Sequence, residues 1–197
     1  MKGAEPEAVV GRLNALPYPP TVWSHGWVYG VWYCGTAWRK AIYHGQYPAT
    51  FVRRVLAAFP ASDFRLLHLC CGRCRVPGAV NVDRVRLPEA DIVADGAALP
   101  FRARVFDVAL ADPPYTADDA AKYGVPMPSR SRLLREMARV TSPGGWILWL
   151  DERYPAYRRK ELHLVGLIGI VTGFLRRTRI LACWRVPGAV IERERAA

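Results

Sequence analysis

The residues Asp112-Pro113-Pro114-Tyr115 stand where an apolar run, residues 104–111, comes to an end. The carboxylate can accept hydrogen bonds, the prolines stiffen the backbone because their rings restrict rotation, and the tyrosine offers a flat aromatic face. Such a group is suited to the floor of an active site. The same four residues are also typical of a proline-stabilised turn after a buried strand, so their surroundings have to distinguish the two.

Three other apolar runs end in residues suited to ligand binding, namely Gly72, Asp83 and Asp95. A glycine lets the backbone approach a ligand closely. The Asp83 carboxylate can accept both hydroxyl hydrogens of a ribose, and Asp95, followed by Gly96-Ala97, can meet an adenine ring and its amino group. One aspartate at such a place is usually a turn or helix-cap residue. Four consecutive runs with such ends, at the spacing of βα units, favour a ligand site.

These ends meet at one place if the runs are neighbouring parallel strands, because ligands bind beyond the carboxyl ends of such strands. Continuous apolar strands alternating with helices indicate an α/β protein with a mostly parallel sheet covered on both faces. Residues 174–177 are short enough to join the last two strands as an antiparallel hairpin. We expect strands over residues 65–72, 79–83, 91–95, 104–111, 146–152, 164–173 and 178–186, helices over 48–59 and 131–145, and loose order over 1–20.

The series LLHLCCG, AVNVD, DIVADGAALPF and FDVALADPPY resembles the class I S-adenosylmethionine-dependent methyltransferase fold, over about residues 64 to 186. The resemblance implies a Rossmann-like, seven-stranded sheet with a terminal antiparallel hairpin, and S-adenosylmethionine as cofactor. The residues DPPY are similar to the catalytic motif of the amino-methylating branch, which includes DNA adenine and cytosine N-methyltransferases. Stretches such as YHGQYP, KYG, GGWILWLDE and LVGLIGI also resemble uncharacterised DNA-methylase-like proteins of bacteria and phages.

The first motif departs from the family pattern at two positions. His68 stands where the family usually has an acidic residue, and Cys74 where it usually has a glycine. Only six residues separate Gly72 from AVNVD, so we expect the usual first helix to be shortened or missing. The methionine end of the cofactor must then be held by the turn backbone, by His68 or by the N-terminal segment. The cofactor-binding residues implied are His68, Cys70, Cys71, Gly72, Asp83, Asp95, Gly96, Ala97 and Asp112.

The four catalytic residues implied by the resemblance are Asp112, Pro113, Pro114 and Tyr115, and their chemistry suits an amine. An amino group conjugated to an aromatic ring is a poor nucleophile because its lone pair is delocalised. Hydrogen bonds from its N–H groups to Asp112 and to the Pro113 carbonyl would favour a pyramidal nitrogen that can attack a sulfonium methyl group. The rigid prolines hold both acceptors in place. Tyr115 offers a stacking face for a planar base, which in duplex DNA must first be flipped out.

The net charge of +11 over 197 residues favours a polyanionic partner such as nucleic acid. An arginine excess beside much alanine and proline is also what a GC-rich genome produces. We expect phosphate contacts from Arg153, Arg158, Arg159 and Lys160, with a solvated loop as the alternative.

Tyr43 and Tyr47 of YHGQYP could close the cofactor site over the substrate. Arg130, Arg132, Arg135 and Arg139 fit the wet face of a helix, and Asp118, Asp119 and Glu136 fit surface charges.

The segment over residues 23–38 is rich in aromatic rings, and two interpretations stay open for it. The rings could stack bases or roof a cofactor, or they could form the core of an N-terminal extension. The rings are Trp23, Trp27, Tyr29, Trp32, Tyr33 and Trp38.

The five cysteines and an N-terminus without a signal-peptide core favour a reducing, cytoplasmic setting. The longest apolar run, residues 164–175, is too short to span a bilayer. His68, Cys70, Cys71 and Cys74 lie within seven residues, but zinc needs four ligands and no second paired cluster exists, so we expect no metal.

Together these features predict an aromatic-rich extension over residues 1–60 and a methyltransferase domain over 61–197. The expected activity is N-methylation of a nucleic-acid base, DNA adenine N6 ahead of cytosine N4, with DNA favoured over RNA as partner and a homodimer possible. The alternatives are a methyltransferase for RNA, a protein side chain or a small molecule, and a non-catalytic relic that binds a cofactor or nucleic acid.

Overall fold

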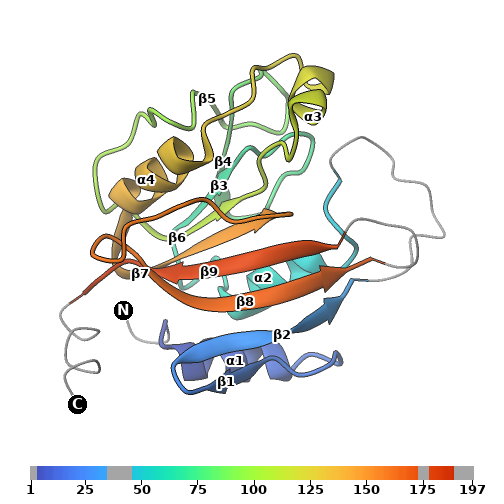
Figure 1. Ribbon diagram of the computed structural model, residues 1–197, viewed down its shortest axis with the longest axis vertical. Helices are drawn as coiled ribbons and strands as arrows, with labels where there is room; N and C mark the ends of the chain where they lie inside the picture. The colour runs from blue at the N-terminus through green and yellow to red at the C-terminus, as the bar shows by residue number, and fades with distance from the viewer. Residues whose placement is uncertain (1–3, 35–45, 173–177, 189–197) are drawn as a thin grey trace.

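The computed structural model describes residues 4–34, 46–172 and 178–188 (Figure 1). Tyr43 and Trp38, expected above to contact substrate or to stack, lie outside these residues. No helix in the described ranges is long and apolar enough to cross a membrane.

One sheet runs through the molecule, in the strand order β1-β2-β8-β9-β7-β6-β3-β4-β5 (Figure 1). Strands β3 to β7 pair in parallel, and β9 pairs antiparallel with both β7 and β8. The predicted mostly parallel sheet with a terminal antiparallel hairpin is therefore confirmed. The strands are β1 (Val22–Ser24), β2 (Trp27–Tyr33), β3 (Leu66–Leu69), β4 (Ala79–Asp83), β5 (Ile92–Val93), β6 (Phe106–Ala111), β7 (Thr141–Asp151), β8 (His163–Val171) and β9 (Arg179–Arg185).

Within the described residues the sheet has nine strands where seven were expected, because the N-terminal segment adds β1 and β2 to its edge. Strand β2 pairs in parallel with β8. A Cβ at Gly166 would lie 2.5 Å from the Val28 carbonyl oxygen, so glycine permits this close approach of the two strands. A boundary at residue 60 stays a prediction, since both parts share one sheet.

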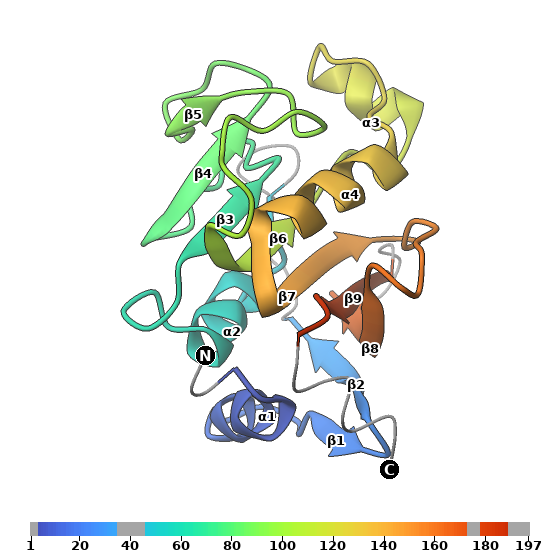
Figure 2. The ribbon, with the colours of Figure 1, turned by 90° about the vertical axis from the view of Figure 1, so that its left-hand side faces the viewer.

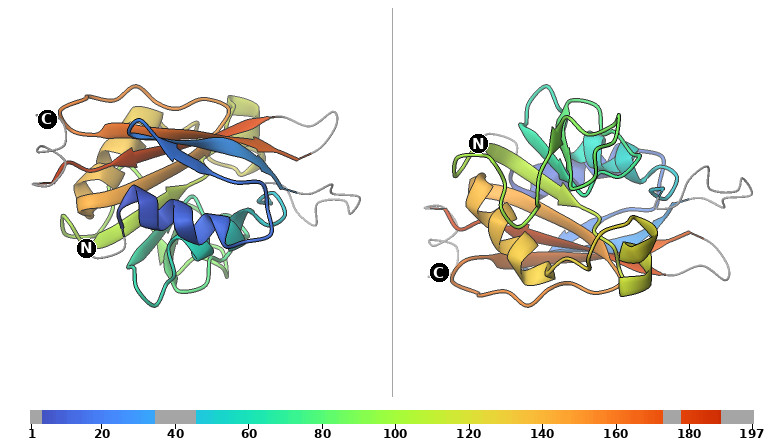
Figure 3. Two further views of the ribbon diagram at one scale, coloured as in Figure 1. Left: turned by 90° about the horizontal axis from the view of Figure 1, so that it is seen from below. Right: turned by 90° about the horizontal axis from the view of Figure 1, so that it is seen from above.

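The helices lie on opposite faces of the sheet (Figures 2 and 3). Helices α1 (Pro6–Asn14) and α2 (Phe51–Ala58) cover one face, and α4 (Arg130–Val140) covers the other. Strand β7 serves both cores because its side chains alternate: Trp146 and Leu148 pack with the first face, Ile147 and Trp149 with the second. The short helix α3 (Ala117–Lys122) follows β6.

Two expectations about the helices were wrong. Residues 6–14 form α1, whose Val9, Val10 and Leu13 are buried, where loose order was expected. The helix expected over 131–145 ends at Val140, and Thr141 already begins β7. At Gly145 a Cβ would lie 2.7 Å from the Asp107 carbonyl oxygen, so the residues after the helix run close against β6 as an irregular strand.

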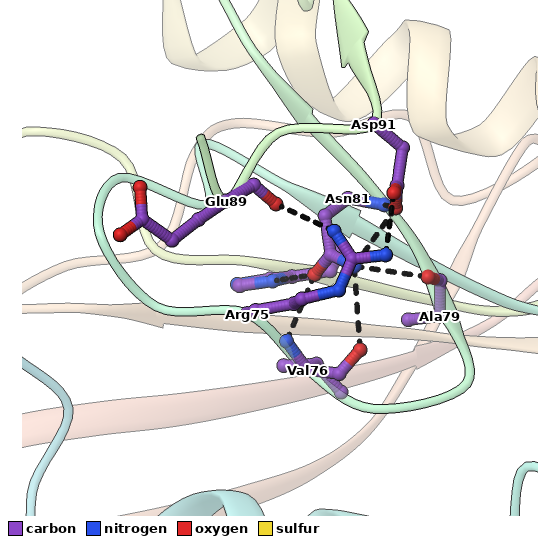
Figure 4. A network of polar contacts seen from close by, with 7 residues as sticks. Arg75, Val76, Ala79, Asn81, Glu89 and Asp91 are labelled. Carbon is purple, nitrogen blue, oxygen red and sulfur yellow. Dashed lines mark hydrogen bonds and ion pairs between the residues drawn. The ribbon is translucent and has the colours of Figure 1, made fainter. Parts of the chain in front are cut away.

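The first helix after β3 is missing, as expected, and residues 70–78, 84–91 and 94–105 contain no helix. A polar network joins the first two of these loops (Figure 4). The side-chain nitrogen of Asn81 lies 2.9 Å from the Ala79 carbonyl and 3.0 Å from Asp91, and its oxygen accepts the Val76 N–H. Arg75 forms an ion pair with Asp91 and bonds to the Glu89 carbonyl. One amide thus replaces backbone bonds that a helix would have supplied.

Candidate functional site

The carboxyl ends of β3, β4, β5 and β6 meet at one cavity of about 800 Å³, as their parallel pairing requires. This volume lies in the range of small-molecule and cofactor sites. Most of the residues predicted from the sequence line it: Tyr47, Cys70, Cys71, Gly72, Asp83, Asp95, Gly96, Asp112, Pro113, Pro114 and Tyr115.

Other predicted residues lie elsewhere. His68 is wholly buried and bonded to Tyr47. Ala97 does not line the cavity, and its N–H bonds to the Asp95 side chain at 2.9 Å. The four basic residues predicted to contact phosphate are exposed on the connection between β7 and β8 and do not line the cavity. They are Arg153, Arg158, Arg159 and Lys160.

The turn after β3 has a backbone adapted to close contact with a ligand. Cys70 and Gly72 have φ values of 57° and 52°, in the left-handed region that few residues other than glycine adopt. The Asp83 carboxylate fixes this turn, because it accepts the Gly72 N–H at 2.8 Å. Its other oxygen accepts the Val85 N–H at 2.9 Å. Each carboxylate oxygen has a second lone pair, so Asp83 can still accept hydroxyl hydrogens.

The wall beside β5 is apolar and tightly packed. A Cβ at Gly96 would lie 2.7 Å from a Leu133 methyl carbon and 3.0 Å from one of Leu69. Leu69, Ala94 and Leu133 line the cavity beside Asp95, which forms a half-exposed ion pair with Arg84 at 3.3 Å. The wall is therefore suited to a flat ring, with a carboxylate at its rim.

The turn after β6 places the Asp112 carboxylate in the cavity, where it is hydrogen-bonded to Tyr115. The Tyr115 hydroxyl donates to Asp112 Oδ1 at 2.5 Å. Burial raises the pKa of Asp112 to about 7, against the opposing effects of the Tyr115 hydrogen bond and of Arg179. Burial also raises the pKa of Tyr115 well above its usual value, so its hydroxyl stays a donor. The Arg179 guanidinium lies 5.5 Å from the centre of the Tyr115 ring.

A buried ion pair that the sequence reasoning missed supports this turn. Arg130 Nε lies 2.7 Å from Oδ2 of Asp151, which is wholly buried at the end of β7. Arg130 Nη2 donates to the Tyr115 carbonyl at 2.6 Å. The assignment of Arg130 to the wet face of its helix was wrong, because the first turn of α4 reaches over the strand ends. Asp119, expected on the surface, is buried and lines the cavity.

A hydrogen-bonded relay of two buried side chains, Asn81 and His68, orients Tyr47. The nitrogen of the Asn81 amide faces only acceptors, so its oxygen faces His68 Nδ1, at 2.9 Å, and must accept from it (Figure 4 shows the Asn81 contacts). Burial lowers the pKa of His68 to about 4, so the ring is neutral and Nε2 accepts the Tyr47 hydroxyl at 2.9 Å. The Tyr47 hydroxyl is thus a donor to His68, and its oxygen keeps lone pairs that can accept a hydrogen bond.

Cys70 and Cys71 are protonated thiols near neutral pH, because burial raises the pKa of Cys71 to about 12 and that of Cys70 well above its usual value. Within the described ranges there is no group of three or more His, Cys, Asp or Glu side chains suited to hold a metal ion.

No protein-family model and no curated protein matches this sequence. Several solved structures do. One is TrmN from Thermus thermophilus, with 16% identity and a TM-score of 0.47, covering 68% of this chain, which spans about half (48%) of TrmN. Another is the 1,6-didemethyltoxoflavin-N1-methyltransferase of Burkholderia thailandensis, with 15% identity and a TM-score of 0.51, covering 70% of this chain and 77% of that one.

The second of these structures holds 1,6-didemethyltoxoflavin and S-adenosylhomocysteine. At such low identity the likeness is one of fold. This chain has the class I methyltransferase Rossmann-like fold, with a mostly parallel sheet and a C-terminal antiparallel hairpin.

Proposed function

We propose that this chain is an S-adenosylmethionine-dependent N-methyltransferase whose acceptor is the amino group of a nucleic-acid base, DNA adenine N6 ahead of cytosine N4. The observation that carries the proposal is the Asp112–Tyr115 turn at the end of β6, which shares one cavity with Gly72 and Asp83. A methyl donor and a planar amine can therefore meet there.

The residues of the cavity fit S-adenosylmethionine. The free lone pairs of Asp83 suit the ribose hydroxyls, and the apolar wall of Leu69, Ala94 and Leu133 suits the adenine ring. The Tyr47 oxygen, oriented by His68, can accept a hydrogen bond from the ammonium of the methionine end. When bound, this cofactor supplies a methyl group on a positively charged sulfonium.

Asp112 and the backbone beside it would prepare the amine. The Tyr115 hydroxyl occupies Oδ1 of Asp112, which leaves Oδ2 to accept one amino N–H. The Pro113 carbonyl can accept the other, and Arg130 restrains the turn through the Tyr115 carbonyl. Two fixed acceptors favour a pyramidal nitrogen with an available lone pair. The proton that the methylated nitrogen releases can pass to Asp112, whose pKa of about 7 suits a base near neutral pH.

Arg179 supports a nucleic-acid substrate. It lines the cavity beside Tyr115, and its buried Nε has no hydrogen-bond partner among the described residues. A guanidinium with an unused donor is suited to a phosphate oxygen or a base carbonyl. The net charge of +11 adds long-range attraction for a polyanion.

Mass spectrometry of nucleosides tests the proposal, in cells that express the wild type, Asp112→Ala or Asp118→Ala. Asp118 is an exposed carboxylate on α3 and serves as the control. We expect N6-methyladenine or N4-methylcytosine in DNA with the wild type and with Asp118→Ala, and background levels with Asp112→Ala. Methylated ribonucleosides instead would identify RNA as the acceptor, and no methylated nucleoside with any variant would exclude nucleic acid. Absence of S-adenosylmethionine binding by calorimetry would refute both enzyme interpretations.

A further inference from the structure

Strand β2 divides the aromatic segment between two faces of the sheet. Val28 and Trp32 are buried against the core beneath α1 and α2. Trp27, Tyr29 and Tyr33 point to the other face and are 44 to 47% exposed. The core interpretation therefore holds for Trp32, whereas stacking by the three exposed rings stays a prediction, because strand residues alternate between faces.

The exposed rings continue an apolar surface across β8. Leu167 lies directly opposite Tyr29, and Val171 lies opposite Tyr33. With Val31, which is 55% exposed, these residues form what we call the aromatic face: Trp27, Tyr29, Val31, Tyr33, Leu167 and Val171. Scattered exposed apolar side chains are ordinary, but a contiguous patch on a sheet marks a binding surface.

The aromatic face lies on the same side of the sheet as α4, since Leu167 packs against the core cluster of that side. Helix α4 packs over β7, and the connection over residues 152–162 covers β9 through edge-to-face contacts of Tyr154 and Tyr157 with Trp184. Figure 3 shows this connection running along the α4 side of the sheet. Among the described residues nothing equivalent covers β2.

The charges around the aromatic face favour a polyanion. Strands β1, β2, β8 and β9 contain no Asp or Glu. The connection over residues 152–162, which borders the aromatic face, carries four exposed basic residues and only two acidic ones, Glu152 and Glu161. Glu161 is paired with Arg158 at 3.2 Å. A second copy of the chain would bring the same net charge of +11 to the interface, and the repulsion opposes it.

The direction of β2 links the aromatic face to the cavity. Because β2 and β8 run parallel to β6, Tyr33 lies at the same sheet edge as Asp112. Four inter-strand spacings separate β2 from β6, which is about 19 Å. Arg179, at the start of β9, lies between them. By alternation along β9 the Arg179 side chain is on the α1 and α2 face, so a strand whose bases stack on β2 would have to cross this sheet edge to reach the cavity.

We propose that the aromatic face binds single-stranded nucleic acid, with bases stacked on Tyr29 and Tyr33 and phosphates held by Arg153, Arg158, Arg159 and Lys160. Aromatic stacking accepts any base, so this surface binds a strand with little sequence preference. The delivery of a base to Asp112 rests on the proposed function, whereas binding of the strand does not.

Fluorescence anisotropy with labelled oligothymidylate, and with its ribonucleotide counterpart, tests the proposal on the full chain. Tyr29→Ser/Tyr33→Ser should weaken binding about tenfold or more, since stacking is lost at two sites. Tyr29→Phe/Tyr33→Phe keeps both rings and should stay within about twofold of the wild type. Binding should also fall steeply with salt. The two probes show whether the strand is DNA or RNA.

Three outcomes would overturn the proposal: no binding of either probe by the wild type at low salt, equal binding by the serine variant, or tighter binding of the matching duplex. A dimer in sedimentation velocity that the serine variant loses would instead assign the aromatic face to a second copy. Binding of the probes and methyl transfer are measured on the same wild-type preparation. A lack of methyl transfer with intact binding would therefore count against the proposed function alone.

Discussion

Replacing Asp112 with asparagine should stabilise the folded protein above neutral pH while it removes methyl transfer. Burial in the cavity, with a smaller effect of Asp151, raises the pKa of Asp112 from 3.8 to about 7. In the unfolded chain the same carboxyl group ionises near its usual pKa of about 3.9. The folded state therefore binds a proton more tightly. The stability that this tighter proton binding gives to the folded state is complete below about pH 4 and is lost as the pH rises through about 7.

The size of the effect follows from the shift in pKa. A rise of about three units corresponds to a ceiling of about 4 kcal/mol, at 1.36 kcal/mol per unit. The side chain is partly open to the cavity, which reduces this ceiling, and the asparagine oxygen can still accept the Tyr115 hydroxyl. We expect a gain of about 1–2 kcal/mol at pH 8, which for a chain of this length raises Tm by about 3–6 °C.

Thermal unfolding followed by circular dichroism, between pH 4.5 and 8.5, measures this gain. The difference in Tm between Asp112→Asn and the wild type should be largest above pH 7 and should shrink by more than half at pH 5. Asp118→Asn, on the exposed side of α3, should show no such trend. An equal or lower Tm for Asp112→Asn at pH 8 would refute the argument that the folded cavity desolvates this carboxylate.

Three other substitutions probe the cavity and its support. Asp83→Ala should lower the affinity for S-adenosylmethionine at least tenfold in calorimetry, and unchanged affinity would exclude the ribose contact. Tyr47→Phe leaves a buried histidine nitrogen without its donor, so the free energy of unfolding should fall by about 1–3 kcal/mol and cofactor affinity should fall with it. Arg130→Gln leaves the buried carboxylate at the end of β7 unpaired and should cost about 3–5 kcal/mol in chemical denaturation. The exposed neighbour variant Arg132→Gln should be near neutral, and a similar loss in both would contradict the role of the ion pair.

The ligand site could be predicted because its chemistry is local to the strand ends. Gly72, Asp83, Asp95 and Asp112 each follow an apolar run, and parallel pairing alone brings such ends to one edge. The turns at these ends could also be predicted from the sequence, because glycine allows backbone angles that other residues avoid and proline restricts them. No long-range contact had to be known.

The features that were missed depend on pairing across long stretches of chain. Strand β2 joins β8 more than a hundred residues away, and nothing in the local pattern of residues 27–33 identifies that partner. The ion pair of Arg130 and Asp151 joins the start of a helix to the end of the next strand. Helical periodicity showed only that Arg130 faces away from the apolar stripe. It could not show that a buried carboxylate lies there.

The titration of His68 also affects how the stability of the protein depends on pH. The pKa of His68 is lowered to about 4 from a usual 6.5, so its effect on stability is lost as pH falls from about 6.5 to 4, opposite in sign to that of Asp112. The hydrogen bond from the Asn81 backbone lowers the pKa of Asp91 to about 2, so the network persists through this window. The wild-type profile alone therefore mixes two opposing titrations. Because His68 is common to the wild type and Asp112→Asn, only the difference between their profiles isolates the cavity carboxylate.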